Sequence, residues 1–223
     1  MRKDSYRDTV GLKKEYWTIK SENTIFCGGN QKRFPDIQMK RDGCGLIAAA
    51  DVLGYLTDVN RVRTEKEYWN YIYSKQRYFH IIQGRGMPAW AMLMGVRKWC
   101  REEKLPYKIR WGCLPGKRYQ NVIKMLSQDI PVILVVGPNF PNKFGKKCVK
   151  FYQKNESGEY IEAASTRGHY VVGLGMENGW LKISSWGSIY YINWKEFEEY
   201  ASKTSFFLFT NICCISKKKR NLK

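Results

Sequence analysis

The chain lacks the features that mark membrane, secreted and metal-binding proteins. No run of about 18 apolar residues occurs, so the sequence predicts no membrane-spanning helix. Residues 1–17 contain no apolar segment of the kind found in signal peptides, and we expect no secretory signal. None of the seven cysteines stands at Cys-x-x-Cys spacing. This argues against a zinc ribbon or a disulfide framework and indicates a reducing cytoplasm, with no metal and no cofactor.

What the chain does contain is typical of a folded globular protein. It has 223 residues, of which 43% are hydrophobic and 15% aromatic. The formal net charge is +19, but the positive residues are spread along the chain and no predicted helix carries a basic stripe. A lysine-rich solvated surface therefore explains the charge better than nucleic-acid binding does. An acidic substrate or partner is the other explanation.

The order of the predicted elements indicates an α+β fold, with helices in the first part of the chain and an antiparallel sheet in the second. We expect a single domain with an N-terminal arm (1–30), a mainly helical part (38–130), a mainly β part (131–215) and a basic tail (216–223). Gln31 to Gly43 is expected to be a loop. The predicted helices cover 44–56, 64–76, 88–103, 119–128 and 194–201. The predicted strands cover 132–137, 168–176, 180–185, 188–192 and 205–215.

The most informative stretch is Gln38 to Leu56, because it places a cysteine at the start of a central helix. Residues 46–56 are apolar on almost every side, with Asp51 the exception, so this helix belongs inside the domain. Cys44 lies between two glycines at its N-terminal end, where unpaired N–H groups and the helix dipole favour a thiolate and lower the pKa. Gln38, six residues earlier, is a candidate oxyanion donor. The alternative role for Cys44 is that of a small buried residue.

The chain has only two histidines, so the choice of a general base is narrow. His169 opens a predicted strand, whereas His80 precedes the strand region and has no orienting segment after it. His169 is therefore the candidate base, with strand packing as its alternative role. Asp42 is expected to cap the helix near Gly43.

Cys44, Gln38 and the segment 168–173, Gly-His-Tyr-Val-Val-Gly, together resemble the papain-like cysteine peptidase superfamily. The likeness is nearest to the bacterial branch related to the double-glycine (bacteriocin-leader) peptidases. A helix and strand at 125–133 and the segment 183–187, Ile-Ser-Ser-Trp-Gly, are similar to the same family's elements. The resemblance covers about residues 38–200 in order. It implies a papain-like fold in which a central Cys-bearing helix packs on the antiparallel sheet.

The resemblance implies that Cys44 is the nucleophile and His169 the base of a thioester acyl-enzyme mechanism. Gln38 and the Cys44 backbone N–H would stabilise the oxyanion. It also implies substrate contacts at Gly43, Gly168 and Trp186.

The third catalytic residue departs from the family pattern, which has Asn or Asp. Alignment on Ser-Trp-Gly selects Ser184, whereas counting from His169 selects Ser185. Successive strand residues face opposite sides, so only one of the two can point at the imidazole. A serine hydroxyl can accept from the ring N–H but lacks the negative charge that stabilises an imidazolium.

The sequence thus favours a cysteine peptidase-like hydrolase acting on a peptide or protein substrate. A thiol acyltransferase would use the same acyl-enzyme. The alternative from another class is a catalytically weak or inactive papain-like domain that binds a peptide or an acidic partner.

Overall fold

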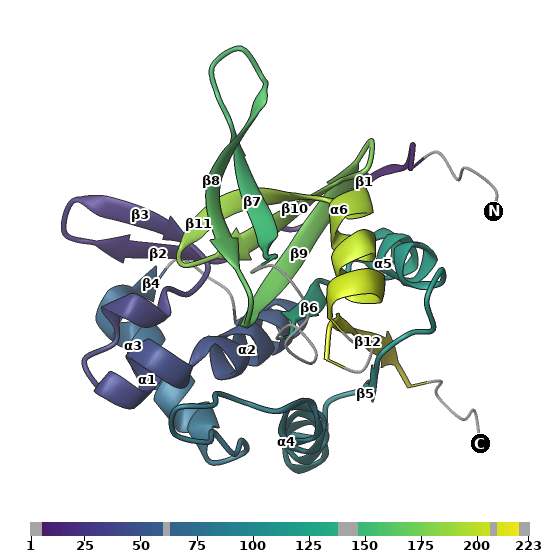
Figure 1. The fold of residues 1–223 in the computed structure, drawn as a ribbon. Coiled ribbons are helices and arrows are strands. Elements are labelled where there is room, and N and C mark those ends of the chain that lie inside the picture. Colours follow the sequence, from purple (N-terminus) through teal and green to yellow (C-terminus); the bar gives the residue numbers. More distant parts are fainter. Residues whose placement is uncertain (1–5, 60–62, 138–146, 206–208, 219–223) are drawn as a thin grey trace.

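The computed structural model describes residues 6–59, 63–137, 147–205 and 209–218 (Figure 1). The fold is α+β, with helix and strand in similar proportions. In Figure 1, helices α1–α4 lie together below a large antiparallel sheet, and α5 and α6 lie to its right. Among the described residues, no helix is both long and apolar enough to cross a membrane.

The helices and strands follow one another closely along the chain. The helices are α1 (Ile37–Asp42), α2 (Cys44–Leu56), α3 (Glu65–Gln76), α4 (Ala89–Glu102), α5 (Arg118–Ser127) and α6 (Trp194–Glu199), with a 3₁₀ helix at Gln31–Arg33 and a π-helical turn at Tyr200–Thr204. The strands are β1 (Thr9–Gly11), β2 (Thr18–Ser21), β3 (Thr24–Cys27), β4 (Arg63–Thr64), β5 (Tyr107–Trp111), β6 (Val132–Val136), β7 (Val149–Lys154), β8 (Tyr160–Thr166), β9 (His169–Glu177), β10 (Trp180–Ser185), β11 (Ser188–Asn193) and β12 (Asn211–Lys217).

The main sheet of the described chain has nine strands and takes members from both parts of the sequence. Its order is β5-β12-β6-β9-β10-β11-β7-β8, and β1 pairs with the end of β9. All of these pairs are antiparallel. A smaller sheet, β3-β2-β4, lies beside the helices. The central position of β9 matters most, because it places His169 at the end of a strand paired on both sides.

Helix α2 is the centre of the core, and the reason is its composition. Eleven of its thirteen residues, from Gly45 to Tyr55, are buried. The helix packs on β6 and β9 on one side and on α3 and α4 on the other. A side chain at Gly54 would bring a Cβ within 2.3 Å of Trp17, so glycine is required where this indole crosses the helix. The prediction of a helix that is apolar on almost every side and lies inside the domain is confirmed, with Asp51 the one charged residue on it.

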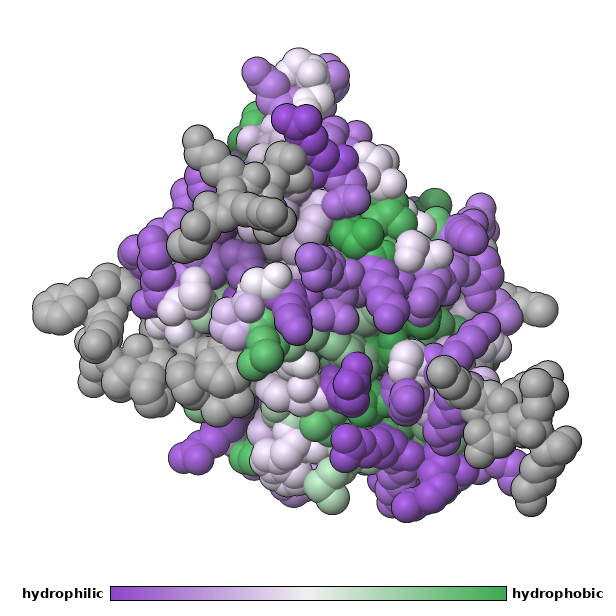
Figure 2. Space-filling model, turned by 90° about the vertical axis from the view of Figure 1, so that its right-hand side faces the viewer, coloured by the Kyte–Doolittle hydropathy of each residue, from purple (hydrophilic) through white to green (hydrophobic). Residues whose placement is uncertain are grey.

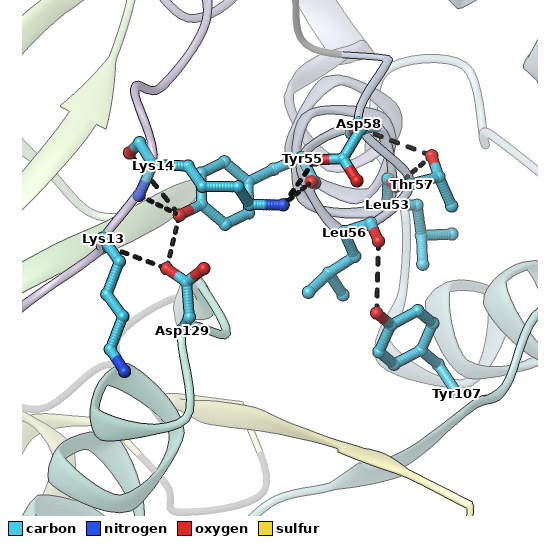
Figure 3. Close-up of polar contacts among 10 residues, drawn as sticks. Lys13, Lys14, Leu53, Tyr55, Leu56, Thr57, Asp58, Tyr107 and Asp129 are labelled. Atoms are coloured by element: carbon cyan, nitrogen blue, oxygen red, sulfur yellow. Dashed lines mark hydrogen bonds and ion pairs between the residues drawn. The ribbon is translucent and has the colours of Figure 1, made fainter.

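The C-terminal end of α2 is fixed by polar contacts, shown in Figure 3. The Tyr55 hydroxyl donates to Asp129, at the turn before β6, and the Lys14 ammonium donates to the Tyr55 carbonyl at 3.1 Å. The Tyr107 hydroxyl of β5 donates to the Leu56 carbonyl at 3.1 Å. The bonds from Lys14 and Tyr107 satisfy carbonyls that a helix end leaves unpaired. They hold α2 in place from the end opposite to Cys44.

Most predicted elements are present, and the differences have local causes. The capping box at Thr64 and Glu67 forms and starts α3. The segment expected to be a loop before Cys44 contains the 3₁₀ helix and α1, the latter capped by the Asp36 carboxylate. The hairpin β7–β8 was not predicted, because apolar and polar residues do not alternate regularly along it and no residue of β8 is buried. Strand β12 starts at Asn211 and runs to Lys217, into the expected tail, whose residues 219–223 lie outside the described chain.

Candidate active site

Cys44 is the first residue of α2 and is half-buried. The glycines on either side of it are explained by close packing. A Cβ at Gly43 would lie 2.5 Å from the Met39 carbonyl oxygen, and one at Gly45 would lie 2.9 Å from Met87 Cβ. Gly43 therefore packs directly against α1, and Gly45 packs directly against the segment before α4, with no room for a side chain at either position. The Gly-Cys-Gly pattern lets two neighbouring segments approach the helix start and leaves the thiol between them.

Cys44 and His169 line the same cleft, whose volume is about 430 Å³. One wall comes from the turn around Gly84–Gly86 and the residues up to Ala89; the other comes from the ends of β6 and β9. Both residues also line a much smaller cavity of about 20 Å³ with Ser185 and Trp186. Residues 125 positions apart in the sequence are therefore brought to one place by the packing of α2 on β9.

His169 is buried, with 7% of its surface exposed. Its Nε2 atom lies 2.9 Å from Ser185 Oγ, and its ring stacks on Trp186 with 4.6 Å between centroids. Trp186 has φ of +48° and Lys32 lies over its ring, 5.3 Å from the centroid. The imidazole is thus held by one polar and one aromatic neighbour, and Nδ1 is the ring nitrogen left for another partner.

The two serines that the sequence left as alternatives have separate partners. Ser185 Oγ faces His169, whereas Ser184 Oγ donates to the Cys27 carbonyl at 2.8 Å. Both are buried, and their opposite directions follow from the alternation of side chains along β10. Counting from His169 selects the serine that contacts the imidazole.

Burial controls the protonation of both candidate catalytic groups. It raises the pKa of the Cys44 thiol, although the Tyr170 and Gly45 backbone N–H groups act to lower it. Burial, together with the nearby charge of Lys32, lowers the pKa of His169 to about 3. The lowered Cys44 pKa expected from the helix N-terminus is therefore wrong for this conformation. Among the described residues, no hydrogen bond joins the Cys44 sulfur to the His169 ring, and the resting site holds a neutral thiol and a neutral imidazole.

The glutamine expected beside Cys44 lies elsewhere. Gln38 is on α1, its amide is 3.5 Å from the Ile81 carbonyl, and it does not belong to the lining of either cavity that Cys44 shares with His169. Gln31, on the 3₁₀ helix, does line the smaller cavity. Its amide donates to the Lys40 carbonyl at 2.9 Å. No sequence spacing pointed to Gln31, because its position near Cys44 depends on how α1 turns the chain between them.

The acidic residues near the site have structural roles. Asp42 does not cap α2; its carboxylate accepts from the Gly84 N–H at 2.7 Å and pairs with Arg41 at 3.1 Å. Burial alone would raise the pKa of Asp42, but the Arg41 and Gly84 bonds hold it below its usual value. This carboxylate ties the start of α2 to the turn that forms one cleft wall.

Asp51 forms a buried polar cluster behind the site. Its carboxylate accepts from the Tyr68 hydroxyl at 2.6 Å, the Gly29 N–H at 3.0 Å and the Tyr16 hydroxyl at 3.3 Å. Burial raises the pKa of Asp51 to about 6. Asp51 lines the smaller cavity together with Ser184. Its signal in the sequence was that it is the one charged residue on an otherwise apolar helix.

Of the other residues considered from the sequence, Gly168 lines the cleft, whereas His80 and Trp180 do not. His80 is exposed, stacks on Trp90 with 6.0 Å between centroids, and does not line the cleft. Trp180 stacks on Tyr160 with 3.8 Å between centroids, away from Cys44. Gly168 lines the cleft, and a side chain there would meet open space.

The charged residues at the cleft are mainly basic. Arg41 and Arg85 line it, and of these Arg41 is paired with Asp42. The side of the molecule shown in Figure 2 is mostly hydrophilic, with small hydrophobic patches separated by polar side chains. In the part of the chain that the structure describes, no three Cys, His, Asp or Glu side chains gather as a metal site.

Comparisons of the chain with protein-family models, with curated proteins and with solved structures found no match.

Proposed function

We propose that this chain is a papain-like cysteine hydrolase that cleaves peptide or amide bonds through a thioester at Cys44. The observation that carries the proposal is that Cys44 and His169 line one cleft, while Ser185, which contacts the His169 ring, lines the adjoining small cavity with both of them. A cysteine at a helix start, an imidazole on the adjacent strand and a group that orients the ring form the arrangement that thiol acyl transfer requires.

The proposed reaction starts from a neutral Cys44 thiol and a neutral His169 imidazole. As the Cys44 sulfur attacks the substrate carbonyl, its proton passes to His169 Nδ1, because Nε2 is engaged with Ser185. The carbonyl oxygen becomes an oxyanion, which the backbone N–H at the start of α2 can stabilise. His169 then gives the proton to the leaving amine, and water hydrolyses the thioester. Ser185 orients the ring but brings no negative charge to the imidazolium.

A second candidate function is a papain-like domain that binds a peptide without cleaving it. It is favoured by the raised pKa of the Cys44 thiol, by the lowered pKa of the buried His169 and by a serine in place of Asn or Asp. The same cleft and its basic rim would then hold the chain of an acidic peptide. The two functions differ in whether the reactivity of the Cys44 thiol depends on His169.

The deciding experiment measures iodoacetamide alkylation of Cys44 at neutral pH by mass spectrometry in three proteins. They are the wild type, His169→Ala and the matched control His80→Ala, which removes an exposed imidazole outside the cleft. A cysteine hydrolase requires alkylation to fall about tenfold or more in His169→Ala and to be unchanged in His80→Ala. Equal rates in all three proteins would leave the binding domain as the function.

Substrate turnover separates hydrolysis from transfer. A peptide thioester should acylate Cys44, seen as a mass increase that decays in water. If decay is faster with an added amine, and the amide product accumulates, the chain acts as a thiol acyltransferase, which shares the acyl-enzyme.

A further inference from the structure

Two thiols that do not line the candidate active site are in direct contact. Cys113 Sγ, just after β5, lies 3.0 Å from Cys214 Sγ, on the neighbouring strand β12. Both side chains are half-buried, so both are reachable from solvent. They line one face of a shallow surface pocket of about 240 Å³ together with Arg110 and Lys117.

The backbone around Cys113 is held in this position from both sides. The Cys113 N–H donates to the Asn211 side chain at 3.0 Å, and the Asn211 amide donates to the Cys113 carbonyl at 3.1 Å. Gly112, with φ of +70°, donates its N–H to the Ile212 carbonyl at 2.9 Å. The turn after β5 is therefore clamped to β12. A disulfide bond is about 2.0 Å long, so bond formation requires the two sulfurs to approach by only about 1 Å.

We propose that Cys113 and Cys214 are a reversible redox site that forms a disulfide by exchange with an acidic low-molecular-weight disulfide of the glutathione class. The proposal is independent of the proposed hydrolase activity. The basic pocket lining complements the carboxylates of such a disulfide. This places an oxidisable pair at the edge of the main sheet, with one cysteine just after the edge strand β5 and the other on its neighbour β12.

The chemistry assigns the first step to Cys113. The hydrogen bond between the two sulfurs lowers the pKa of Cys113 to about 7, with Arg110 and Arg118 adding to the effect. The Cys113 thiolate attacks one sulfur of the external disulfide, and the other sulfur leaves as a thiolate with the bonding electrons. Cys214 then loses its proton to water and attacks the Cys113 sulfur, expelling the second external thiolate. Two protein thiols are oxidised and one external disulfide is reduced to two thiols.

The other cysteines are less suited to this reaction. Burial raises the pKa of Cys27 and of Cys100 to about 11, and it also raises that of Cys213 and Cys44. Thiolates, not thiols, attack disulfides. Exchange should therefore select Cys113 among these five positions, and Cys148, which is half-buried, serves as the control cysteine.

A disulfide between Cys113 and Cys214 would affect a residue that lines the cleft. Trp111, two residues before Cys113, lines the cleft that contains Cys44. Trp111 is also the β5 partner of Cys213, next to Cys214 on β12. A covalent link between Cys113 and Cys214 would fix the end of β5 on which Trp111 lies.

The test starts with the fully reduced protein and a series of oxidised glutathione concentrations, followed by alkylation and mass spectrometry. We expect loss of two of the seven alkylatable thiols, a mass decrease of two hydrogen atoms, and one crosslinked peptide pair containing Cys113 and Cys214. A dithiol reductant should restore all seven. A glutathione adduct that persists on wild-type Cys113, or a crosslink between other cysteines, would overturn the proposal.

Variants test the order of the steps and the class of the disulfide. Cys214→Ser should stop at one glutathione adduct on Cys113, and Cys148→Ser should crosslink as the wild type does. Lys117→Glu should slow the reaction with oxidised glutathione severalfold but leave that with uncharged bis(2-hydroxyethyl) disulfide unchanged. Equal effects on both reagents would contradict recognition of an acidic disulfide.

Discussion

Ser185 Oγ lies 2.9 Å from His169 Nε2, while the neighbouring Ser184 faces away and donates to the Cys27 carbonyl. The two serines thus have the same chemistry, the same burial and different partners. This makes them a matched pair for separating a positioning role from a structural one.

Ser185→Ala should reduce Cys44 alkylation by about fivefold to tenfold, because the bond that orients the imidazole is worth about 1 kcal/mol. Ser184→Ala should leave the alkylation rate unchanged and lower the free energy of unfolding by about 1 kcal/mol, since the buried Cys27 carbonyl loses its donor. The measurements are alkylation kinetics and urea unfolding of both variants. A rate loss in Ser184→Ala equal to that in Ser185→Ala would show that neither serine acts specifically on His169.

The pH dependence of Cys44 alkylation should be that of a neutral pair. Burial raises the thiol pKa and lowers that of His169 to about 3, so no imidazolium is present near neutral pH to hold a thiolate. The rate should therefore rise with pH through the alkaline range, beyond the usual cysteine pKa of about 8.5. A plateau already reached below pH 6 would show a preformed ion pair and contradict this arrangement.

Asp51 should make the protein less stable as the pH rises. Its pKa is about 6 in the folded chain and about 3.9 when unfolded. Because the folded value is the higher one, the folded state binds more protons between these pH values. The contribution of Asp51 to stability is therefore largest below about pH 4 and is lost as the pH rises through 6.

The size of this change follows from a difference of about two pKa units, which corresponds to about 3 kcal/mol. Asp51→Asn cannot titrate, so the unfolding free energy of the wild type relative to this variant should fall by roughly that amount between pH 4 and pH 7. Urea unfolding at several pH values measures it, with the exposed Asp8→Asn as a control for lost charge. A difference that stays constant with pH would rule out titration of Asp51.

Gly45→Ala and Gly168→Ala test the two sides of the cleft. At Gly45 a Cβ would lie 2.9 Å from Met87 Cβ, while at Gly168 it would meet nothing within 4 Å. Overpacking costs about 1–3 kcal/mol, which exceeds the gain of about 1 kcal/mol from alanine in a helix. Gly45→Ala should thus lower the unfolding free energy, and Gly168→Ala should change it by less than about 0.5 kcal/mol. Thermal unfolding checks both, and equal stability of the two variants would contradict the packing argument.

The sequence was most informative where one local pattern decides the structure. The all-round apolar helix and the capping box at Thr64 each contain their own signal, and both are present as predicted. Strand alternation also predicted that only one of Ser184 and Ser185 can face His169. The structure was needed to show that this residue is Ser185.

The sequence was less informative where tertiary packing decides. The six-residue spacing of Gln38 and Cys44 could not show that α1 turns Gln38 toward Ile81. The pKa of Cys44 depends on burial supplied by β9, and the contact of Cys113 with Cys214 joins residues 101 positions apart. Such properties arise from packing between distant segments, for which a single sequence carries no periodic signal.

The packing of α2 on β9 also sets the order in which the site can come into existence. The ribosome completes α2 long before it reaches β6 and β9, the strands that cover one side of this helix. Until then the most apolar helix of the chain, with Cys44 at its tip, has no sheet to bury it, and unburied apolar surface favours aggregation. Contacts between such distant segments also slow folding. Newly made chains therefore pass through a stage in which a chaperone has an apolar segment to bind and the cysteine has no histidine beside it.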